Sequence, residues 1–393
     1  MIVQQKQNAR QESAVNWDSV AKSIADGEAV LVLGPDSIPF YPAGAEAMQH
    51  PGNELTFSQL SREYIRNNPE VTINYYYEKD NLFLFRDEMS KKAARKAVRD
   101  AARDKQWLPD EELLRQIVSV PFPVILSLSP DRTVYEAFMR YSRVTPQFDF
   151  CSPYNNSKTQ DKIVSEPSAS NPLIYNLCGN IFEKLDSPVL DFFDLFQLLI
   201  KLLGNSDEIP VWLGRKLKEA DTYILMGFQL ERWYFQMFLH YINWLDNNAY
   251  TNSNQNFSIL SKVSDDSAEF ILNQFNLKHI APNRSDFDAL CEACKRAGVL
   301  REVLSAASPL ETQARVLIEQ SKLDEAMDLI EAHIGGAESR VDLPHLRARY
   351  NNWKANYHAQ LEDPRQLQTE INKIRYALLT YAAQLHAYEH STV

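Results

Sequence analysis

The stretch AVLVLGPDS, residues 29–37, decides the fold. It begins with five apolar residues in a row, and a glycine follows at position 34. A short, continuous apolar run that ends at a glycine is typical of a strand buried on both faces of a parallel sheet. In such sheets the ligand crevice lies where the strands end. The stretch therefore predicts a central strand that runs into a turn at the binding edge of an α/β sheet.

Three later stretches share this pattern, and helical patterns such as 87–102 and 110–118 separate them. The further predicted strands are FPVILSLS (122–129), PLIYNLCG (172–179) and TYILMGF (222–228). Strands that alternate with helices form parallel sheets with helices on both faces. We therefore predict an α/β fold with a doubly wound, Rossmann-like parallel sheet.

The length and composition of the chain indicate a globular protein of more than one domain. It has 393 residues, of which 45% are hydrophobic and 24% charged, and a single core rarely serves so long a chain. After about residue 290 only helical periodicity remains. We predict an α/β domain over 1–295, a linker over 296–310 and a small helical bundle over 311–393. The net charge of −11 argues against nucleic acid as a partner, because phosphates require a dense basic face.

The sequence suggests neither secretion nor a membrane partner, so we expect a cytoplasmic protein. The first 15 residues lack an apolar core, and the richest apolar stretch, 189–204, is interrupted by two aspartates and a lysine. That stretch is also shorter than the roughly 20 residues that span a bilayer. The chain has four cysteines, too few for a disulfide framework. Cys291 and Cys294 form a C-x-x-C without a second pair, so we expect no metal site.

The ends of the four predicted strands read GPDS (34–37), SLSPD (127–131), CG (178–179) and GFQLERW (227–233). In this order they resemble the sirtuin-like family of NAD-consuming proteins, and within it the bacterial branch found in defence systems. The resemblance extends over about residues 15 to 290. It implies NAD as the cofactor, held by the residues that match the family's binding positions: Gly34, Ser37, Ser127, Asp131, Gly179 and Gly227.

The reactive positions depart from the family. Ser129 stands where active members have an asparagine, and Cys178 stands where they have the histidine that acts as a base. Pro35 removes a backbone N–H that a phosphate would accept, and Asp36 adds a repelling carboxylate. We therefore expect no catalytic residues. Weakened NAD binding and a purely structural glycine turn both remain open.

Ordinary structural roles compete with each of these assignments. Asp131 and Arg132 could contact a ligand, but Asp131 also suits a helix N-cap. The aromatic residues at 233–235 could stack on an adenine, although aromatics after a strand usually pack a helix onto the sheet. Cys178, as a lone cysteine that ends an apolar strand, is typically a small buried hydrophobe.

The tail carries a second resemblance. It looks like an effector-associated domain, a small helical module that recruits effectors to sensors in bacterial immune systems. The matching residues are Leu346, Arg349, Tyr350, Asn351, Glu370, Asn372, Ile374, Ala377, Leu378 and Leu379. The predicted helix that contains Leu346 to Asn351 is basic, and the predicted helix before it is acidic. Such faces could pair between copies, through the interaction residues Arg347, Arg349, Lys354, Asp324, Glu325 and Asp328, or they could pair within the bundle.

Together the two resemblances imply a sirtuin-like protein that has lost catalysis and serves as an adaptor, regulator or effector in bacterial antiviral defence. Its expected partner is another protein with an effector-associated domain, such as a sensor ATPase or a protease, and self-association is a further option. Two alternatives remain: an NAD glycohydrolase that depletes NAD when activated, and a sensor that binds NAD or an ADP-ribose derivative without cleaving it.

Overall fold

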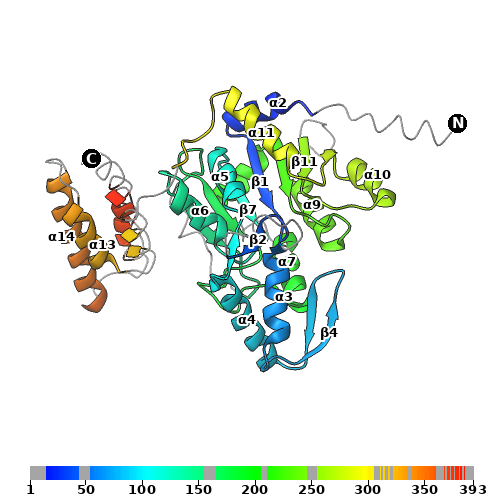
Figure 1. Ribbon diagram of the computed structural model, residues 1–393, viewed down its shortest axis with the longest axis horizontal. Helices are drawn as coiled ribbons and strands as arrows, with labels where there is room; N and C mark the ends of the chain where they lie inside the picture. Colours follow the sequence, from blue (N-terminus) through cyan, green and yellow to red (C-terminus); the bar gives the residue numbers. More distant parts are fainter. Residues whose placement is uncertain are drawn as a thin grey trace. The chain divides into compact units, whose positions relative to one another are not determined.

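The computed structural model describes residues 15–43, 54–154, 165–204, 210–245 and 255–304, and much of 310–385, including 322–333 and 339–359. The chain forms two units (Figure 1). The first comprises Met1–Thr133 and Gln147–Arg301, and the second comprises Val134–Pro146 and Glu302–Val393. The change at residues 301–302 falls within the stretch 296–310 that the sequence suggests as a linker.

Seven parallel strands form the sheet at the centre of the first unit, as the sequence predicts. Their order is β12-β11-β10-β1-β7-β9-β8, so the chain begins in the middle, adds strands on one side of β1 and then adds the rest on the other. The strands are β1 (Ala29–Leu33), β7 (Val124–Ser127), β8 (Gln147–Phe150), β9 (Leu173–Asn176), β10 (Thr222–Met226), β11 (Gln255–Ile259) and β12 (Leu277–Ile280). The register aligns Leu33 with Met226 on one side and with Ser127 on the other.

Helices flank this sheet, and side-chain caps begin several of them. Asp87 accepts a hydrogen bond from the backbone N–H of Ser90 at 2.8 Å, and Asp110 accepts one from Leu113 at 2.8 Å. Such caps satisfy N–H groups that have no partner inside the helix. The helices of the first unit are α2 (Trp17–Ala25), α3 (Phe57–Asn67), α4 (Glu88–Arg103), α5 (Glu111–Ser119), α7 (Phe192–Gly204), α8 (Val211–Glu219), α9 (Trp233–Leu245), α10 (Asp265–Gln274) and α11 (Ser285–Arg296).

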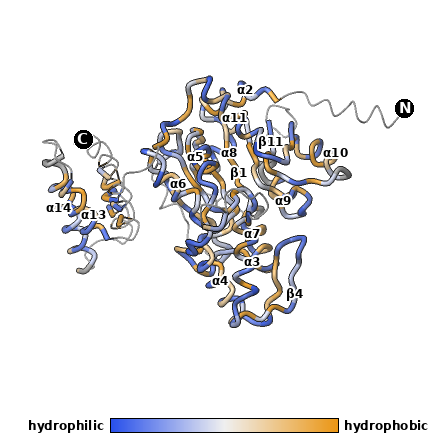
Figure 2. The backbone as a smooth tube through the Cα atoms, in the orientation of Figure 1, coloured by the Kyte–Doolittle hydropathy of each residue, from blue (hydrophilic) through white to orange (hydrophobic). Residues whose placement is uncertain are grey.

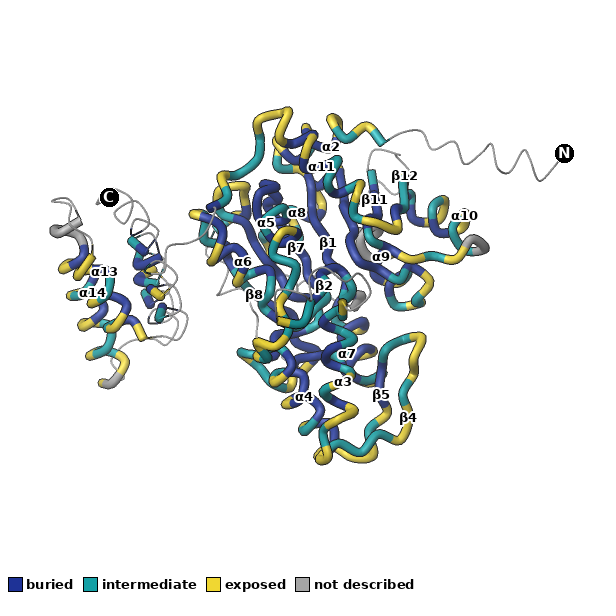
Figure 3. Tube along the Cα trace, viewed as in Figure 1, coloured by how far each residue is buried: buried dark blue, intermediate teal, exposed yellow. Residues whose placement is uncertain are grey.

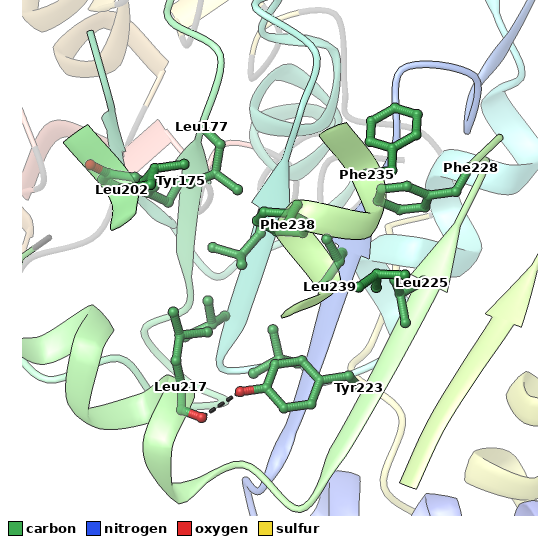
Figure 4. Close-up of a cluster of buried hydrophobic side chains, with 14 of the residues drawn as sticks. Tyr175, Leu177, Leu202, Leu217, Tyr223, Leu225, Phe228, Phe235, Phe238 and Leu239 are labelled. Carbon is green, nitrogen blue, oxygen red and sulfur yellow. Dashed lines mark hydrogen bonds between the residues drawn. The ribbon is translucent and has the colours of Figure 1, made fainter. Parts of the chain in front are cut away.

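The main core lies between one face of the sheet and α7, α8 and α9. Alternate residues of the strands point into it, as strand geometry requires, and Figure 4 shows Tyr223 and Leu225 of β10 facing Phe238 and Leu239 of α9. The Tyr223 hydroxyl donates a hydrogen bond to the carbonyl oxygen of Leu217. The central strands are hydrophobic and buried, whereas the helices alternate between hydrophobic and hydrophilic residues (Figures 2 and 3).

A subdomain inserted between β1 and α5 stands at the carboxyl edge of the sheet. It contains α3, α4, a three-stranded antiparallel sheet and the hairpin β4–β5, whose strand β4 is mostly exposed (Figure 3). The small sheet has the order β3-β2-β6. The strands are β2 (Pro39–Pro42), β3 (Leu55–Thr56), β4 (Ile73–Tyr77), β5 (Leu82–Phe85) and β6 (Trp107–Pro109).

Buried charges join this subdomain to α7. Asp194 of α7 is fully buried and accepts hydrogen bonds from Lys91 Nζ at 2.7 Å and from the hydroxyl of Tyr154. Lys91 also lies 2.6 Å from Asp191, and Arg95 lies 3.4 Å from Asp194. Burying charges is costly unless they are paired and hydrogen-bonded, so this cluster ties α4 tightly to the first turn of α7.

The second unit is mostly helical in the part that the structure describes, with one antiparallel bridge between Ser142 and Val303. It contains α6 (Thr133–Tyr141), α13 (Leu323–His333) and α14 (Ser339–Ala359). Along α14 the side chains of Leu343, Leu346 and Tyr350 are buried, whereas Tyr357 has 57% of its surface exposed. Among the described residues of the whole chain, no helix has the length and apolar character that crossing a membrane requires.

Candidate functional site: an apolar cavity at the carboxyl edge of the sheet

A cavity of about 140 Å³ lies where the strands of the large sheet end. The loops after β1, β7 and β9 form one side of it, and α3, α7, α9 and the hairpin β4–β5 form the rest. Most of the lining residues are apolar, and leucine is the commonest of them. Polar groups come from a few residues only, among them Arg62, Ser61, Asp80, Ser129 and Arg232. The cavity lies at the carboxyl edge of the sheet, the edge at which doubly wound proteins bind ligands.

The glycine turn after β1 has already used its backbone N–H groups. The N–H of Gly34 donates to the carbonyl of Met226 at 2.7 Å, that of Asp36 donates to Gly227 at 3.3 Å, and that of Ser37 donates to Gly34 at 3.3 Å. Pro35 has no N–H to offer. The chain then continues into β2 rather than into a helix, so the turn lacks the helix N-terminus that usually attracts a phosphate.

Asp36, next to this turn, acts as a structural acceptor. Its carboxylate accepts hydrogen bonds from the Thr56 hydroxyl at 3.0 Å and from Gln229 Nε2 at 2.8 Å. Ser37 is buried and donates from its hydroxyl to the carbonyl of Gly34 at 2.8 Å. The side chains of Asp36 and Ser37 are therefore engaged in hydrogen bonds within the protein.

The glycines predicted to contact a cofactor are sites of close backbone approach. A Cβ atom on Gly34 would lie 2.4 Å from the carbonyl oxygen of Gly227, and one on Gly179 would lie 2.4 Å from that of Ser187. Gly227 and Gly179 also have positive φ angles, of 73° and 94°, a conformation that favours glycine. Each glycine thus has a structural reason to be there.

The residues after β7 form a local hydrogen-bond network. The Ser127 hydroxyl accepts from the N–H of Ser129 at 3.2 Å, and the Ser129 hydroxyl donates to the Asp131 carboxylate. Asp131 also accepts from the N–H of Thr133, the first residue of α6, at 2.7 Å. This last bond satisfies an N–H at the start of α6, although the residue that immediately precedes the helix is Arg132 and not Asp131.

Cys178, which follows β9, lines the cavity among apolar neighbours. Desolvation, followed by the nearby Cys151 thiol, raises the pKa of Cys178 to about 12. Only about one thiol in 10⁵ is then ionised at pH 7. Since the thiolate is the reactive form, Cys178 is poorly suited to act as a base or a nucleophile.

Two arginines that the sequence analysis did not single out supply most of the charge of the cavity. Arg62 lies on α3, and Arg232 directly precedes α9. Arg62 belongs to no motif, and Arg232 lies in the stretch 227–233 without an assigned role there; both line this cavity although they are 170 residues apart in the chain. The only local signal was that Ser58, Ser61, Arg62 and Ile65 share one side of a predictable helix.

The aromatic residues after β10 differ in burial: Phe235 is buried in the core, whereas Trp233 is 36% exposed.

The charged residues predicted for interaction in the tail pair with one another inside the bundle. Arg347 of α14 lies 2.7 Å from Asp328 and 3.0 Å from Glu331 of α13. Lys354 bonds Asp324 at 2.5 Å, and Arg349 bonds Glu370 at 2.6 Å. Glu325 lies 3.7 Å from Lys322, which directly precedes α13. These contacts are those of the second interpretation, in which the opposite charges hold α13 and α14 together.

Cys291 and Cys294 are both buried on α11. Desolvation raises their pKa values to about 12 and about 11. Within the described ranges, no cluster of three or more histidine, cysteine or acidic side chains is arranged to bind a metal.

Comparison with known proteins identifies the tail. Residues 310–386 match the family model of effector-associated domain 11. None of the curated proteins matches the chain. Residues 310–386 are thus similar to effector-associated domain 11, and the α/β unit that precedes them in the chain has a Rossmann-like parallel sheet.

Proposed function

We propose that this protein is an adaptor or regulatory component of a bacterial antiviral effector system. In this proposal its α/β unit is a sirtuin-like scaffold without catalytic activity, and its effector-associated domain recruits a partner with a related domain. The observation that carries the proposal is the match of residues 310–386 to effector-associated domain 11, because modules of this kind mediate association in effector systems.

Two features of the α/β unit argue against turnover of NAD. The N–H groups of the glycine turn are bonded to Met226, Gly227 and Gly34, so a pyrophosphate would have to displace protein acceptors. The thiol of Cys178, with its pKa raised to about 12, is a poor replacement for an imidazole base. Both features disfavour the NAD glycohydrolase and support a scaffold role.

Tyr357 of α14 is our choice for the recruiting surface. It is 57% exposed, and its ring stacks on Trp353 with the ring centroids 5.2 Å apart. An aromatic side chain held rigidly on a helix is the type of residue that anchors interfaces. The charged residues of the same helix are less suitable, because charge reversal there would also disturb the contact between α13 and α14.

Recruitment is tested by co-elution of the full chain with a second protein that carries effector-associated domain 11. We expect Tyr357→Ala to weaken co-elution at least tenfold. Tyr75→Ala is the matched control, since Tyr75 is 58% exposed on the hairpin of the other unit. Failure of the unmodified chain to bind any such partner would overturn recruitment, and equal loss in both variants would show that Tyr357 is not a specific contact.

The absence of turnover is tested separately, by following nicotinamide release from NAD over hours with the full chain, alone and with the partner. We expect no release in either mixture. Release that disappears in Cys178→Ala would show a thiol-based enzyme and would contradict the scaffold role.

A further inference from the structure

The cavity at the carboxyl edge combines apolar walls with a cationic rim. Its α7 wall consists of Leu195, Leu198, Leu199 and Leu202, which repeat at helical spacing on the inner side of that helix. Its charged lining residues are Arg62, Arg232 and Asp80, two positive and one negative, for a net charge of +1. Such a site favours a ligand with a compact apolar body and one negative charge.

Both guanidinium groups are linked, each through a tyrosine hydroxyl, to the turn between β4 and β5. Arg62 Nη1 donates to the hydroxyl of Tyr76 at 3.2 Å, and that hydroxyl donates to Asn81 Oδ1 at 2.6 Å. Arg232 Nη1 donates to the hydroxyl of Tyr234 at 3.0 Å, and that hydroxyl donates to the carbonyl of Asp80 at 2.8 Å. Tyr76 thus links Arg62 to Asn81, and Tyr234 links Arg232 to the adjacent residue Asp80.

The turn itself is held in place. Asn81 has a left-handed backbone, with φ of 55°, and its Nδ2 donates to the Ser58 hydroxyl on α3 at 2.6 Å. Since each arginine uses one described side-chain hydrogen bond for its anchor, the remaining N–H groups of a five-donor fork are available to a ligand. Preorganised donors of this kind lower the entropic cost of binding.

Two buried polar atoms at the cavity have no hydrogen-bond partner among the residues that the structure describes. They are Ser61 Oγ, on a side chain with 8% exposure, and Arg232 Nε. Both residues line the cavity. A buried polar group without a partner is costly, and native proteins rarely retain one without reason. Both atoms have almost no accessible surface, so a small movement of each side chain would accompany its bonding to a bound acceptor.

We propose that this cavity binds a small carboxylate with a single ring or a branched apolar body. A cavity of about 140 Å³ is close to the roughly 150 Å³ cavity that accommodates benzene in another protein. The leucines enclose the apolar body, and Arg62 and Arg232 receive the carboxylate, whose planar geometry matches the guanidinium fork. Ser61 donates its hydroxyl to the same group.

The lining disfavours a dinucleotide in the same space. A pyrophosphate needs several donors, and the backbone N–H groups of the neighbouring glycine turn are already bonded within the protein. This inference concerns the α/β unit alone and does not depend on the recruiting role of the tail.

The test measures binding of benzoate and of its neutral isostere benzamide to the full chain, by calorimetry and by the shift of the melting temperature. We expect benzoate to bind at least tenfold more tightly than benzamide, since charge-assisted pairs with arginine are worth a factor of this order. Arg62→Met and Arg232→Met should each weaken benzoate binding about tenfold. Equal affinity for the two compounds, or binding of neither, would overturn the proposal.

Arg66→Met is the matched control. Arg66 lies on the same helix as Arg62, and its guanidinium also stacks on the Tyr76 ring, at 4.5 Å from the ring centroid, but it does not line the cavity. We expect it to leave benzoate binding unchanged, and a loss equal to that of Arg62→Met would indicate only general electrostatic attraction. NAD is included as a competitor: displacement of benzoate by micromolar NAD would contradict the assignment of ligand class.

Ser61→Ala separates ligand binding from folding. In the free protein it removes a buried hydroxyl without a partner, so the melting temperature should rise or stay constant. Benzoate should nevertheless bind more weakly and stabilise the variant less than the unmodified chain. A variant that binds benzoate with unchanged affinity would show that Ser61 does not contact the carboxylate. Leu198→Phe, which fills the cavity, should abolish binding while the fold persists.

Discussion

Gly34 and Gly227 meet backbone to backbone across the end of β1 and β10. A Cβ atom on Gly34 would lie 2.4 Å from the Gly227 carbonyl oxygen, and one on Gly227 would lie 2.2 Å from the backbone of Ser37. Because β1 and β10 flank the point where the strand order reverses, this is where a doubly wound sheet normally opens a crevice. Here the protein's own backbone occupies it, and the open space lies farther along the edge, towards β7 and β9.

The close approach predicts a large cost for any side chain at these glycines. Gly34→Ala should lower the free energy of unfolding by about 3 kcal/mol, because backbone atoms cannot give way as a flexible side chain could. Gly214→Ala is the control: it lies in α8 with no atom within 4 Å of the added Cβ, and it should stabilise by about 0.5–1 kcal/mol. Urea unfolding of the two variants measures both effects, and similar midpoints would refute the packing argument.

The buried charge cluster predicts that Asp194 is important for stability. Asp194→Asn leaves Lys91 and Arg95 without their fully buried partner, and breaking such a cluster typically costs about 3–5 kcal/mol. By contrast, Arg296→Gln breaks an exposed pair with Asp18 and should change stability by no more than about 0.5 kcal/mol. Comparable losses in the two variants, measured by urea unfolding, would contradict the role assigned to burial.

The ion pairs between α13 and α14 predict that charge reversal in the tail acts on folding. Arg347→Glu should lower the stability of the helical unit by up to about 1 kcal/mol, since Arg347 is only partly shielded from solvent. Adding Glu331→Arg should recover part of the loss, because it restores one pair of opposite charges. A double variant no more stable than the single one would show that the pair contributes nothing.

The raised thiol pKa values predict a loss of stability at alkaline pH. Cys178 ionises near pH 12 in the folded chain against an ordinary value of 9.0, and Cys151 ionises near 11. Above pH 9 the unfolded chain releases these protons while the folded chain keeps them, so the free energy of unfolding falls as pH rises from about 9 towards 12 and is unaffected by these groups below 9. Cys178→Ala should flatten this fall, measured as urea midpoints between pH 8 and 11.

The same pKa shift predicts slow alkylation. At pH 8 iodoacetamide should modify Cys178 far more slowly in the folded chain than in urea, because it reacts with the thiolate. Peptide mass spectrometry reports the rate at this position. Rapid modification of Cys178 in the folded protein would contradict the raised pKa.

Local sequence was enough to predict the centre of the fold. The apolar runs at 29–34, 122–129, 172–179 and 222–228 contain β1, β7, β9 and β10, because strands buried on both faces need uninterrupted hydrophobicity. The caps Asp87 and Asp110 likewise act through residues three positions away. The edge strands β8 and β12 and the neighbouring β11 were not predicted, since their segments mix polar and apolar residues and form strands only beside an existing sheet.

What the sequence by itself determined is therefore the parallel sheet, the helical tail and its effector-associated motif, all of which depend on patterns within one segment. Tertiary structure alone decided the rest. Whether Gly34 faces a phosphate or a carbonyl depends on Gly227, and whether Arg347 faces a partner or Asp328 depends on the neighbouring helix. Arg62 and Arg232 meet at one hairpin turn only after folding. Binding sites and ion pairs are set by distances between segments remote in the chain, and local sequence patterns do not contain those distances.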